Sequence, residues 1–195
     1  MLPPHEGNTG KMKTFKNRKF AVLITVIVAI IATLFGVYKS TSRLSKDIEA
    51  MFYDGVTLSK EGYVQPSIAS HLKSHTDAAL NMATILVKYP QLKDDADNVM
   101  RLRRELLDAE SIGNKSETFR KMSASVNSIT QAALKADLSE RDAAAVNQYA
   151  STITGAETAI RNSAYNQTAS MRWSEQSSIT RLIGILLPVR QPEFF

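Results

Sequence analysis

Nineteen uncharged residues follow one another without a break at residues 20–38, with the sequence FAVLITVIVAIIATLFGVY. As an α-helix rising about 1.5 Å per residue, this segment is roughly as long as the hydrocarbon core of a bilayer is thick. A helix also satisfies its own backbone hydrogen bonds, as a segment in lipid must. The pattern therefore predicts a transmembrane helix at residues 20–38 that ties the chain to the lipid bilayer.

Beyond this segment, apolar residues recur at steps of three and four positions, which places them on one face of a helix. No stretch shows the sustained alternation of apolar and polar residues that is typical of a strand. The helices are long and their connections short, so we expect an all-α fold, with an antiparallel bundle of four or five long helices behind the membrane helix. The clearest stripes run through residues 68–86, 92–109, 119–136 and 146–171.

Residues that are typical of helix ends and helix starts lie between the apolar stripes. Pro66 suits the first position of a helix, and Pro90 should end the preceding helix at or before its neighbour. Gly113 is typical of a helix end, and Asn114 and Ser139 each begin a four-residue pattern typical of a capped helix start. These positions predict where the helices of the bundle begin and end.

The predicted elements divide the chain into four parts. Residues 1–19 are expected to be a basic, mostly disordered tail, residues 20–38 the transmembrane helix, residues 39–187 the helical-bundle domain, and residues 188–195 an extended tail. Residues 179–187 are apolar but too short to span a bilayer. They lack the basic face of a helix that lies on a membrane surface, so packing against the bundle is favoured over a position in the membrane interface.

The charge of the chain is concentrated beside the apolar segment. The formal net charge is +5, yet residues 39–195 hold 19 basic and 18 acidic residues, whereas residues 1–19 hold five basic residues and one acidic residue. The domain therefore has no basic stripe, which argues against nucleic-acid binding. The more basic flank of a membrane helix tends to stay in the cytoplasm. We expect a cytoplasmic N-terminus and an extracytoplasmic C-terminal domain in a bacterial plasma (inner) membrane.

A cleaved signal peptide is the alternative interpretation of the same segment. The apolar region of a signal peptide is shorter, about 7–15 residues, and is followed by a cleavage site with small residues. Here Val37 and Tyr38 stand at that place, directly before Lys39, and both are bulky. The sequence therefore favours an uncleaved, single-pass anchor.

Candidate chemistry is sparse. The chain has no cysteine, which excludes disulfides, thiol catalysis and cysteine metal sites. His71 and His75 share one helix face and could share a cation, but no carboxylate stands between them as a metalloprotease requires, and Lys73 would oppose the cation. No phosphate-binding loop, nucleophile elbow or kinase motif occurs. The sequence therefore predicts no catalytic residues, no metal site and no cofactor.

Residues 156–166, AETAIRNSAYN, resemble the LemA family, in which a long helix carries a glutamate, an apolar residue and an arginine ahead of a Tyr-Asn pair. That family then has a Gly/Phe-containing segment and a Phe-bearing end, and residues 182–184 and 192–195 stand at a similar distance along this chain. Residues 72–89 look like a weakened form of its leucine-rich second-helix motif, without the arginine pair and the proline-containing core. The match is loose over residues 20–195 and specific only near the C-terminus.

The resemblance implies a single-pass bacterial membrane protein with an antiparallel helical bundle, and it supplies no activity. The motif singles out Glu157, Arg161, Tyr165 and Asn166 as candidate binding residues. Glu157 and Arg161 stand four residues apart on one helix, as do Arg161 and Tyr165, and pairs at this spacing stabilise helices. A structural role for these residues is therefore the alternative to a ligand site, and it is the favoured one.

Three functions remain open at this point. The leading hypothesis is a non-enzymatic interaction or scaffold module of the cell envelope, which associates with itself or with protein partners. The second is a ligand-sensing helical bundle, which would need a membrane partner because the chain has no second apolar stretch of spanning length. The third is a hydrolase that uses His71 or His75.

Overall fold

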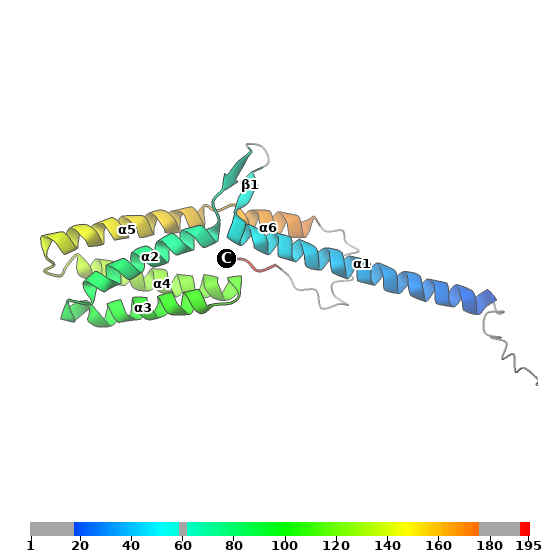
Figure 1. The fold of residues 1–195 in the computed structure, drawn as a ribbon, viewed down its shortest axis with the longest axis horizontal. Coiled ribbons are helices and arrows are strands. Elements are labelled where there is room, and N and C mark those ends of the chain that lie inside the picture. The colour runs from blue at the N-terminus through cyan, green and yellow to red at the C-terminus, as the bar shows by residue number, and fades with distance from the viewer. Residues whose placement is uncertain (1–17, 59–61, 176–191) are drawn as a thin grey trace, which may run out of the picture. The chain divides into compact units, whose positions relative to one another are not determined.

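A computed structural model of the chain describes residues 18–58, 62–175 and 192–195. The described residues form long helices and one short hairpin (Figure 1), which confirms the predicted all-α class with an N-terminal apolar helix followed by a helical bundle. The apolar segment at residues 179–187, most of the basic N-terminal tail and part of the predicted C-terminal tail lie outside the described residues. The elements are α1 (Arg18–Asp54), β1 (Val56–Leu58), β2 (Tyr63–Gln65), α2 (Ile68–Leu86), a 3₁₀ turn (Pro90–Leu92), α3 (Lys93–Asp108), α4 (Ile112–Ala133), α5 (Glu140–Arg161) and α6 (Tyr165–Ser174).

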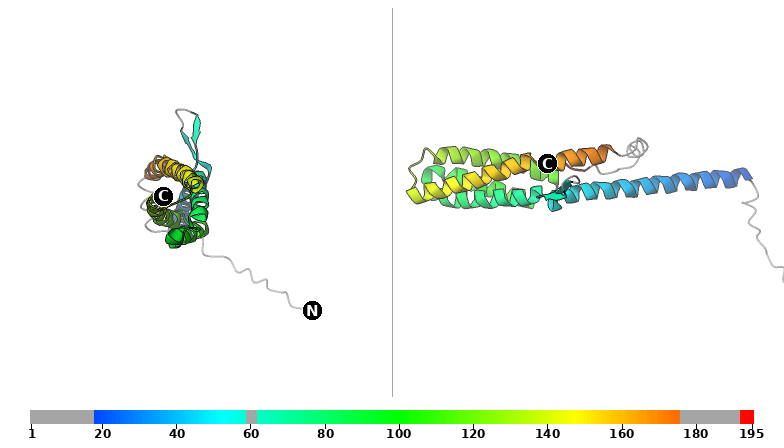
Figure 2. Two further views of the ribbon diagram at one scale, coloured as in Figure 1. Left: turned by 90° about the vertical axis from the view of Figure 1, so that its left-hand side faces the viewer. Right: turned by 90° about the horizontal axis from the view of Figure 1, so that it is seen from above.

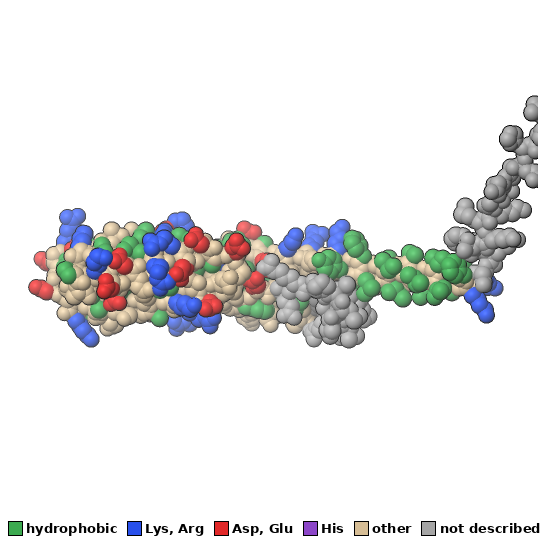
Figure 3. Space-filling model, turned by 90° about the horizontal axis from the view of Figure 1, so that it is seen from below, with side chains coloured by type: hydrophobic (Ala, Val, Ile, Leu, Met, Phe, Trp, Pro, Cys, Tyr) green, Lys and Arg blue, Asp and Glu red, His purple; other side chains and the backbone are tan. Residues whose placement is uncertain are grey.

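The chain divides into two compact units, and the described part of the first is residues 18–41 of α1. The most apolar 18-residue window of α1 has a mean hydropathy of 2.9, and none of it is buried within the protein. Val22, Ile31 and Phe35 are each more than half exposed. Figure 3 shows hydrophobic side chains over the visible face of this part of α1. This helix is long and apolar enough to cross a membrane, and lipid would cover the surface that it leaves exposed.

The second unit contains the four-helix bundle. Helix α2 packs against α5 and α3, and α3 packs against α4. Successive helices run antiparallel and side by side (Figures 1 and 2). The predicted apolar stripes lie on the buried faces of these helices, because burying apolar surface is the main favourable term in folding. The largest buried apolar side chains of the bundle include Leu72, Met82, Leu86, Val99, Leu102, Leu106, Met122, Val126, Ile129, Val146 and Ile153.

The observed helix starts are set by serine caps. The hydroxyl oxygens of Ser67, Ser111 and Ser139 each accept a hydrogen bond from the backbone N–H three residues later. Such a cap satisfies one of the N–H groups that a helix start leaves without a partner. The predicted start at Ser139 and the helix end before Pro90 are confirmed. The predictions at Pro66, Gly113 and Asn114 are wrong: Pro66 precedes the Ser67 cap, and Gly113 and Asn114 lie in the first turn of α4 because Ser111 caps that helix.

A short antiparallel hairpin, β1–β2, follows α1 and was not predicted from the sequence. Its three-residue strands pair Val56 with Gln65, and strands this short carry no recognisable alternation. Gly55, directly before β1, has φ +93°, and a Cβ atom there would lie 2.3 Å from the carbonyl oxygen of Gln65. The Gln65 side chain accepts a hydrogen bond from the N–H of Ala164 at 2.8 Å. The hairpin thereby holds the connection between α5 and α6.

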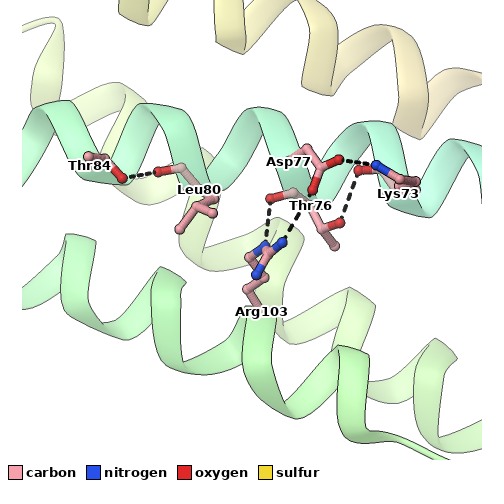
Figure 4. A network of polar contacts seen from close by, with 6 residues as sticks. All are labelled: Lys73, Thr76, Asp77, Leu80, Thr84 and Arg103. Carbon is pink, nitrogen blue, oxygen red and sulfur yellow. Dashed lines mark hydrogen bonds and ion pairs between the residues drawn. The ribbon is translucent and has the colours of Figure 1, made fainter.

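A polar network joins α2 to α3 near the middle of the bundle (Figure 4). The Arg103 guanidinium donates through Nε to the Thr76 carbonyl and through Nη2 to Asp77 Oδ1, both at 3.2 Å. Lys73 Nζ lies 2.6 Å from Asp77 Oδ2. The Lys73 ammonium, with help from Arg103, holds the pKa of the Asp77 carboxyl below its ordinary value.

Replacing Arg103 by glutamine is expected to lower the free energy of unfolding by about 0.5–1.5 kcal/mol, because two hydrogen bonds between α2 and α3 are lost. Chemical denaturation of the full chain in detergent measures this change. The matched control is Arg104→Gln on the same helix, an exposed position expected to change stability by less than about 0.5 kcal/mol. Equal losses in the two variants would contradict a specific role for the network.

Candidate functional site

A pocket of about 490 Å³ opens between α4 and α5. Its walls come from residues 116–127 of α4, the last turns of α5, the first turn of α6 and Phe195. We call it the α4–α5 pocket. Of the four candidate residues from the sequence motif, Glu157, Arg161 and Asn166 line it, and Tyr165 is buried next to Asn166. The lining residues are Ser116, Phe119, Arg120, Ser123, Asn127, Glu157, Ile160, Arg161, Asn166 and Phe195.

Glu157 turns inward and contacts a histidine on α2. The distance from Glu157 Oε1 to His75 Nε2 is 3.2 Å, and the His75 side chain is fully buried. Burial lowers the pKa of His75, and the hydrogen bond to Glu157 opposes this shift without reversing it. A neutral imidazole that donates its Nε2–H to the carboxylate satisfies these constraints. His75 Nδ1 then has no hydrogen-bond partner among the described residues, and the ring meets Phe119 edge to face at 5.0 Å between centroids.

The structure corrects the expected pairing of the motif residues. Helix α5 ends at Arg161 and α6 begins at Tyr165, so these two residues do not stand on one helix as expected. Glu157 accepts a hydrogen bond from His75, and no ion pair between Glu157 and Arg161 forms among the described side chains. His71 and His75 share one face of α2 by spacing, but His75 is fully buried whereas His71 is half-buried. In the part of the chain that the structure describes, no three His, Asp or Glu side chains gather in a way that could hold a metal ion.

Tyr165 and Asn166 hold the last residues of the chain against the bundle. The Tyr165 hydroxyl donates to the Glu193 carbonyl at 2.7 Å. Asn166 Oδ1 accepts from the Phe195 N–H at 3.0 Å, and Asn166 Nδ2 donates to the Phe195 main-chain oxygen at 2.5 Å. Glu193 Oε2 accepts from the N–H of Gly113 at 2.9 Å, within the first turn of α4, where the helix dipole favours a carboxylate.

The ring of Phe195 completes an aromatic cluster at this end of the bundle. It lies 5.5 Å from the ring of Phe52 on α1 and 5.4 Å from that of Phe119 on α4, between centroids. Phe52 also meets the ring of Tyr165 edge to face at 5.8 Å. Burial raises the pKa of the Tyr165 phenol, so its hydroxyl keeps the proton that it donates to Glu193. Two motif residues, Tyr165 and Asn166, thus act as anchors for residues 193–195.

Arg161 stands apart from the other motif residues. It makes no hydrogen bond or ion pair with any residue that the structure describes. Arg120 on the facing helix α4 makes none either, although its charge, after that of Lys121, helps to lower the pKa of Glu117. Both side chains are on exposed residues at the pocket. No pattern in the sequence singles out Arg120, because one arginine on a solvated helix face cannot be told from another. The arrangement brings two guanidinium groups, neutral hydroxyl and amide groups, and an apolar wall to one cavity.

The comparisons with known proteins add no relative. No protein-family model, no curated protein and no solved structure matches the chain.

Proposed function

We propose that this chain is a single-pass, membrane-anchored helical-bundle protein of LemA type, without evident catalytic activity, that serves as an interaction or scaffold module of the cell envelope. The observation that carries the proposal is the continuity of α1. Its exposed apolar residues 20–38 and its core residues Ile48, Met51 and Phe52 belong to one uninterrupted helix. Because the same helix supplies core side chains to the folded domain, an uncleaved anchor is favoured over a cleaved signal peptide.

The charge pattern supports the orientation of this anchor. Five basic residues precede the apolar segment within nine positions, and three follow it. Since basic flanks resist translocation, the bundle is expected outside the cytoplasm of a bacterial plasma membrane. Glu157, Tyr165 and Asn166 each bond to another part of the chain, which favours a structural role for these motif residues.

A reporter fused after Phe195 tests the location. We expect a reporter that is active only outside the cytoplasm to give signal, and one that is active only inside to give none. Replacing Lys11, Lys13, Lys16, Arg18 and Lys19 by glutamine serves as the control, since removing the basic flank should weaken this orientation. A cytoplasmic signal from the unaltered chain would overturn the proposed topology.

Intact mass and extraction behaviour test the anchor itself. An uncleaved anchor predicts a chain of the full 21.6 kDa that resists alkaline extraction from membranes. A shorter, extractable chain would show that residues 20–38 act as a signal peptide. Crosslinking in cells followed by detergent pull-down then tests the interaction role: recovery of monomer alone, with no partner, would contradict it.

The α4–α5 pocket favours a second candidate function, a ligand-sensing bundle that acts through a membrane partner. The specific observation is the pair of arginines, Arg120 and Arg161, that line one cavity and make no hydrogen bond or ion pair with a described residue. Stabilisation of the full chain by a compound that does not stabilise the Arg161→Gln variant would support this function.

A further inference from the structure

We propose that the α4–α5 pocket binds a small organic anion, with a phosphate or carboxylate group held by Arg120 and Arg161 and an apolar body against the aromatic wall. The site follows from the side chains around one cavity. It requires neither the membrane orientation nor the interaction role of the bundle.

The charges around the pocket give the first argument. Arg120 comes from α4 and Arg161 from α5, and Glu157 is the acidic side chain among the lining residues. Glu157 already faces the imidazole of His75 at 3.2 Å. Glu117 lies one turn before Arg120, but its carboxylate is already bonded to Lys121 at 2.6 Å. Neither guanidinium of the pocket makes a hydrogen bond or ion pair with a described residue. Arginine recognises phosphate and carboxylate groups through paired N–H donors, so a bound anion would supply the missing partner.

The neutral polar groups give the second argument. Ser116, Ser123 and Asn127, all on α4, are among the residues that line the pocket. The Ser123 hydroxyl is shielded from solvent and has no hydrogen-bond partner among the described residues. Leaving a buried hydroxyl unpaired costs free energy, so a ligand oxygen within reach of Ser123 would be favoured. An unpaired group of this kind calls for an explanation, and the proposed ligand supplies one.

Size and apolar lining define the rest of the ligand. The volume of about 490 Å³ lies within the range of cavities that hold small molecules, roughly 300–1,000 Å³. Phe119, Ile160 and Phe195 form the apolar part of the lining. An aromatic ring or a branched chain would pack there, whereas inorganic phosphate would leave this surface in water. The geometry therefore points to an anion with an apolar body.

Isothermal titration of the full chain in detergent with phenyl phosphate and phenylacetate tests the site. Both probes carry one aromatic ring and one anionic group, and 2-phenylethanol is the neutral control. We expect saturable binding of at least one anion and none of the alcohol. The tighter of the two anions identifies the headgroup, phosphate or carboxylate. Arg120→Gln and Arg161→Gln are each expected to weaken binding by roughly tenfold or more, as the loss of a charge-assisted hydrogen bond does.

Arg141→Gln is the matched control, because Arg141 lies on the same helix as Arg161, about 30 Å away along its axis, and is exposed. It should bind the probe as the unaltered chain does. Three results would overturn the proposal: no saturable binding of either anion, equal binding of 2-phenylethanol, or an equal loss in Arg141→Gln. Thermal unfolding of each variant without probe separates loss of the site from loss of the fold, and a variant that binds weakly although it is as stable as the unaltered chain supports the site.

Discussion

Replacing Tyr165 by alanine is expected to lower the free energy of unfolding by about 3–5 kcal/mol, the range for removing a large buried aromatic side chain. Tyr165 has no exposed surface, and its ring packs edge to face on Phe52. Its hydroxyl also bonds the Glu193 carbonyl. The substitution therefore opens a cavity beneath the aromatic cluster and releases a contact with the end of the chain. Denaturation of the full chain, followed by the fluorescence of Trp173, measures the loss.

Two further variants separate the parts of this effect. Tyr165→Phe keeps the ring and removes only the hydroxyl, so a loss of about 0.5–1.5 kcal/mol is expected. Tyr63→Ala removes a tyrosine that is 53% exposed in β2, and we expect it to cost at most about 1 kcal/mol. If Tyr165→Ala proved as mild as Tyr63→Ala, the structural role assigned to Tyr165 would be wrong, and a role confined to ligand binding would replace it.

The second large effect is a fall in stability at mildly acidic pH, caused by His75. Burial holds the pKa of His75 below the 6.5 of the unfolded chain. The unfolded state therefore binds more protons between these two values, and the free energy of unfolding falls as the pH decreases through this window. The slope is at most about 1.4 kcal/mol per pH unit, since one group titrates. Above pH 6.5, His75 is neutral in both states and this dependence is absent.

Substitution assigns the dependence to one histidine. His75→Gln cannot titrate, so its stability is expected to vary less between pH 6.5 and pH 5 than that of the unaltered chain. The carboxyls with a lowered pKa, Asp77, Glu117 and Asp142, have ordinary values of 3.8–4.5 and lose their contributions at lower pH. His71→Gln is the control for removing a histidine from the same helix. If it flattened the profile as much as His75→Gln, the assignment to His75 would fail.

Glu157 provides an independent check of the same contact. Glu157→Ala removes the acceptor of the His75 Nε2–H and leaves that donor buried without a partner, which is expected to cost about 1–3 kcal/mol at neutral pH. In the double variant Glu157→Ala, His75→Leu, the buried donor is gone as well, so part of the loss should be recovered. If the two single effects simply added, the residues would not be coupled.

Much of the fold follows from local patterns in the sequence. The apolar segment at residues 20–38 needs no partner to be recognised, because its length and composition alone match a bilayer. The stripes of the bundle are equally local, since a helix repeats every 3.6 residues whatever it packs against. The serine at position 139 could be identified as a cap because a cap bonds within its own first turn. The hairpin β1–β2 could not be recognised from the sequence, since three-residue strands show too little alternation of apolar and polar residues.

In the candidate site, too, the sequence could identify residues that are close together along the chain but not the contacts between distant ones. The motif residues Glu157, Arg161, Tyr165 and Asn166 could be named from the sequence, because they stand together in it. The residues that they contact could not be named in this way. His75 lies 82 positions from Glu157, and Glu193 lies 28 positions from Tyr165. Spacing along one helix suggested that Glu157 pairs with Arg161, yet Glu157 turns to His75.

By itself, the sequence determined the apolar helix, the all-α class, the basic N-terminal flank and the helical stripes, because each depends on residues within a few turns of one another. Only the tertiary structure decided that Glu157 meets a buried histidine, that Tyr165 and Asn166 hold residues 193–195, and that Arg120 and Arg161 share one cavity. The physical reason is that contacts between helices depend on how each helix is rotated and placed against its neighbours. That rotation is fixed by the packing of the whole core, which no local pattern contains.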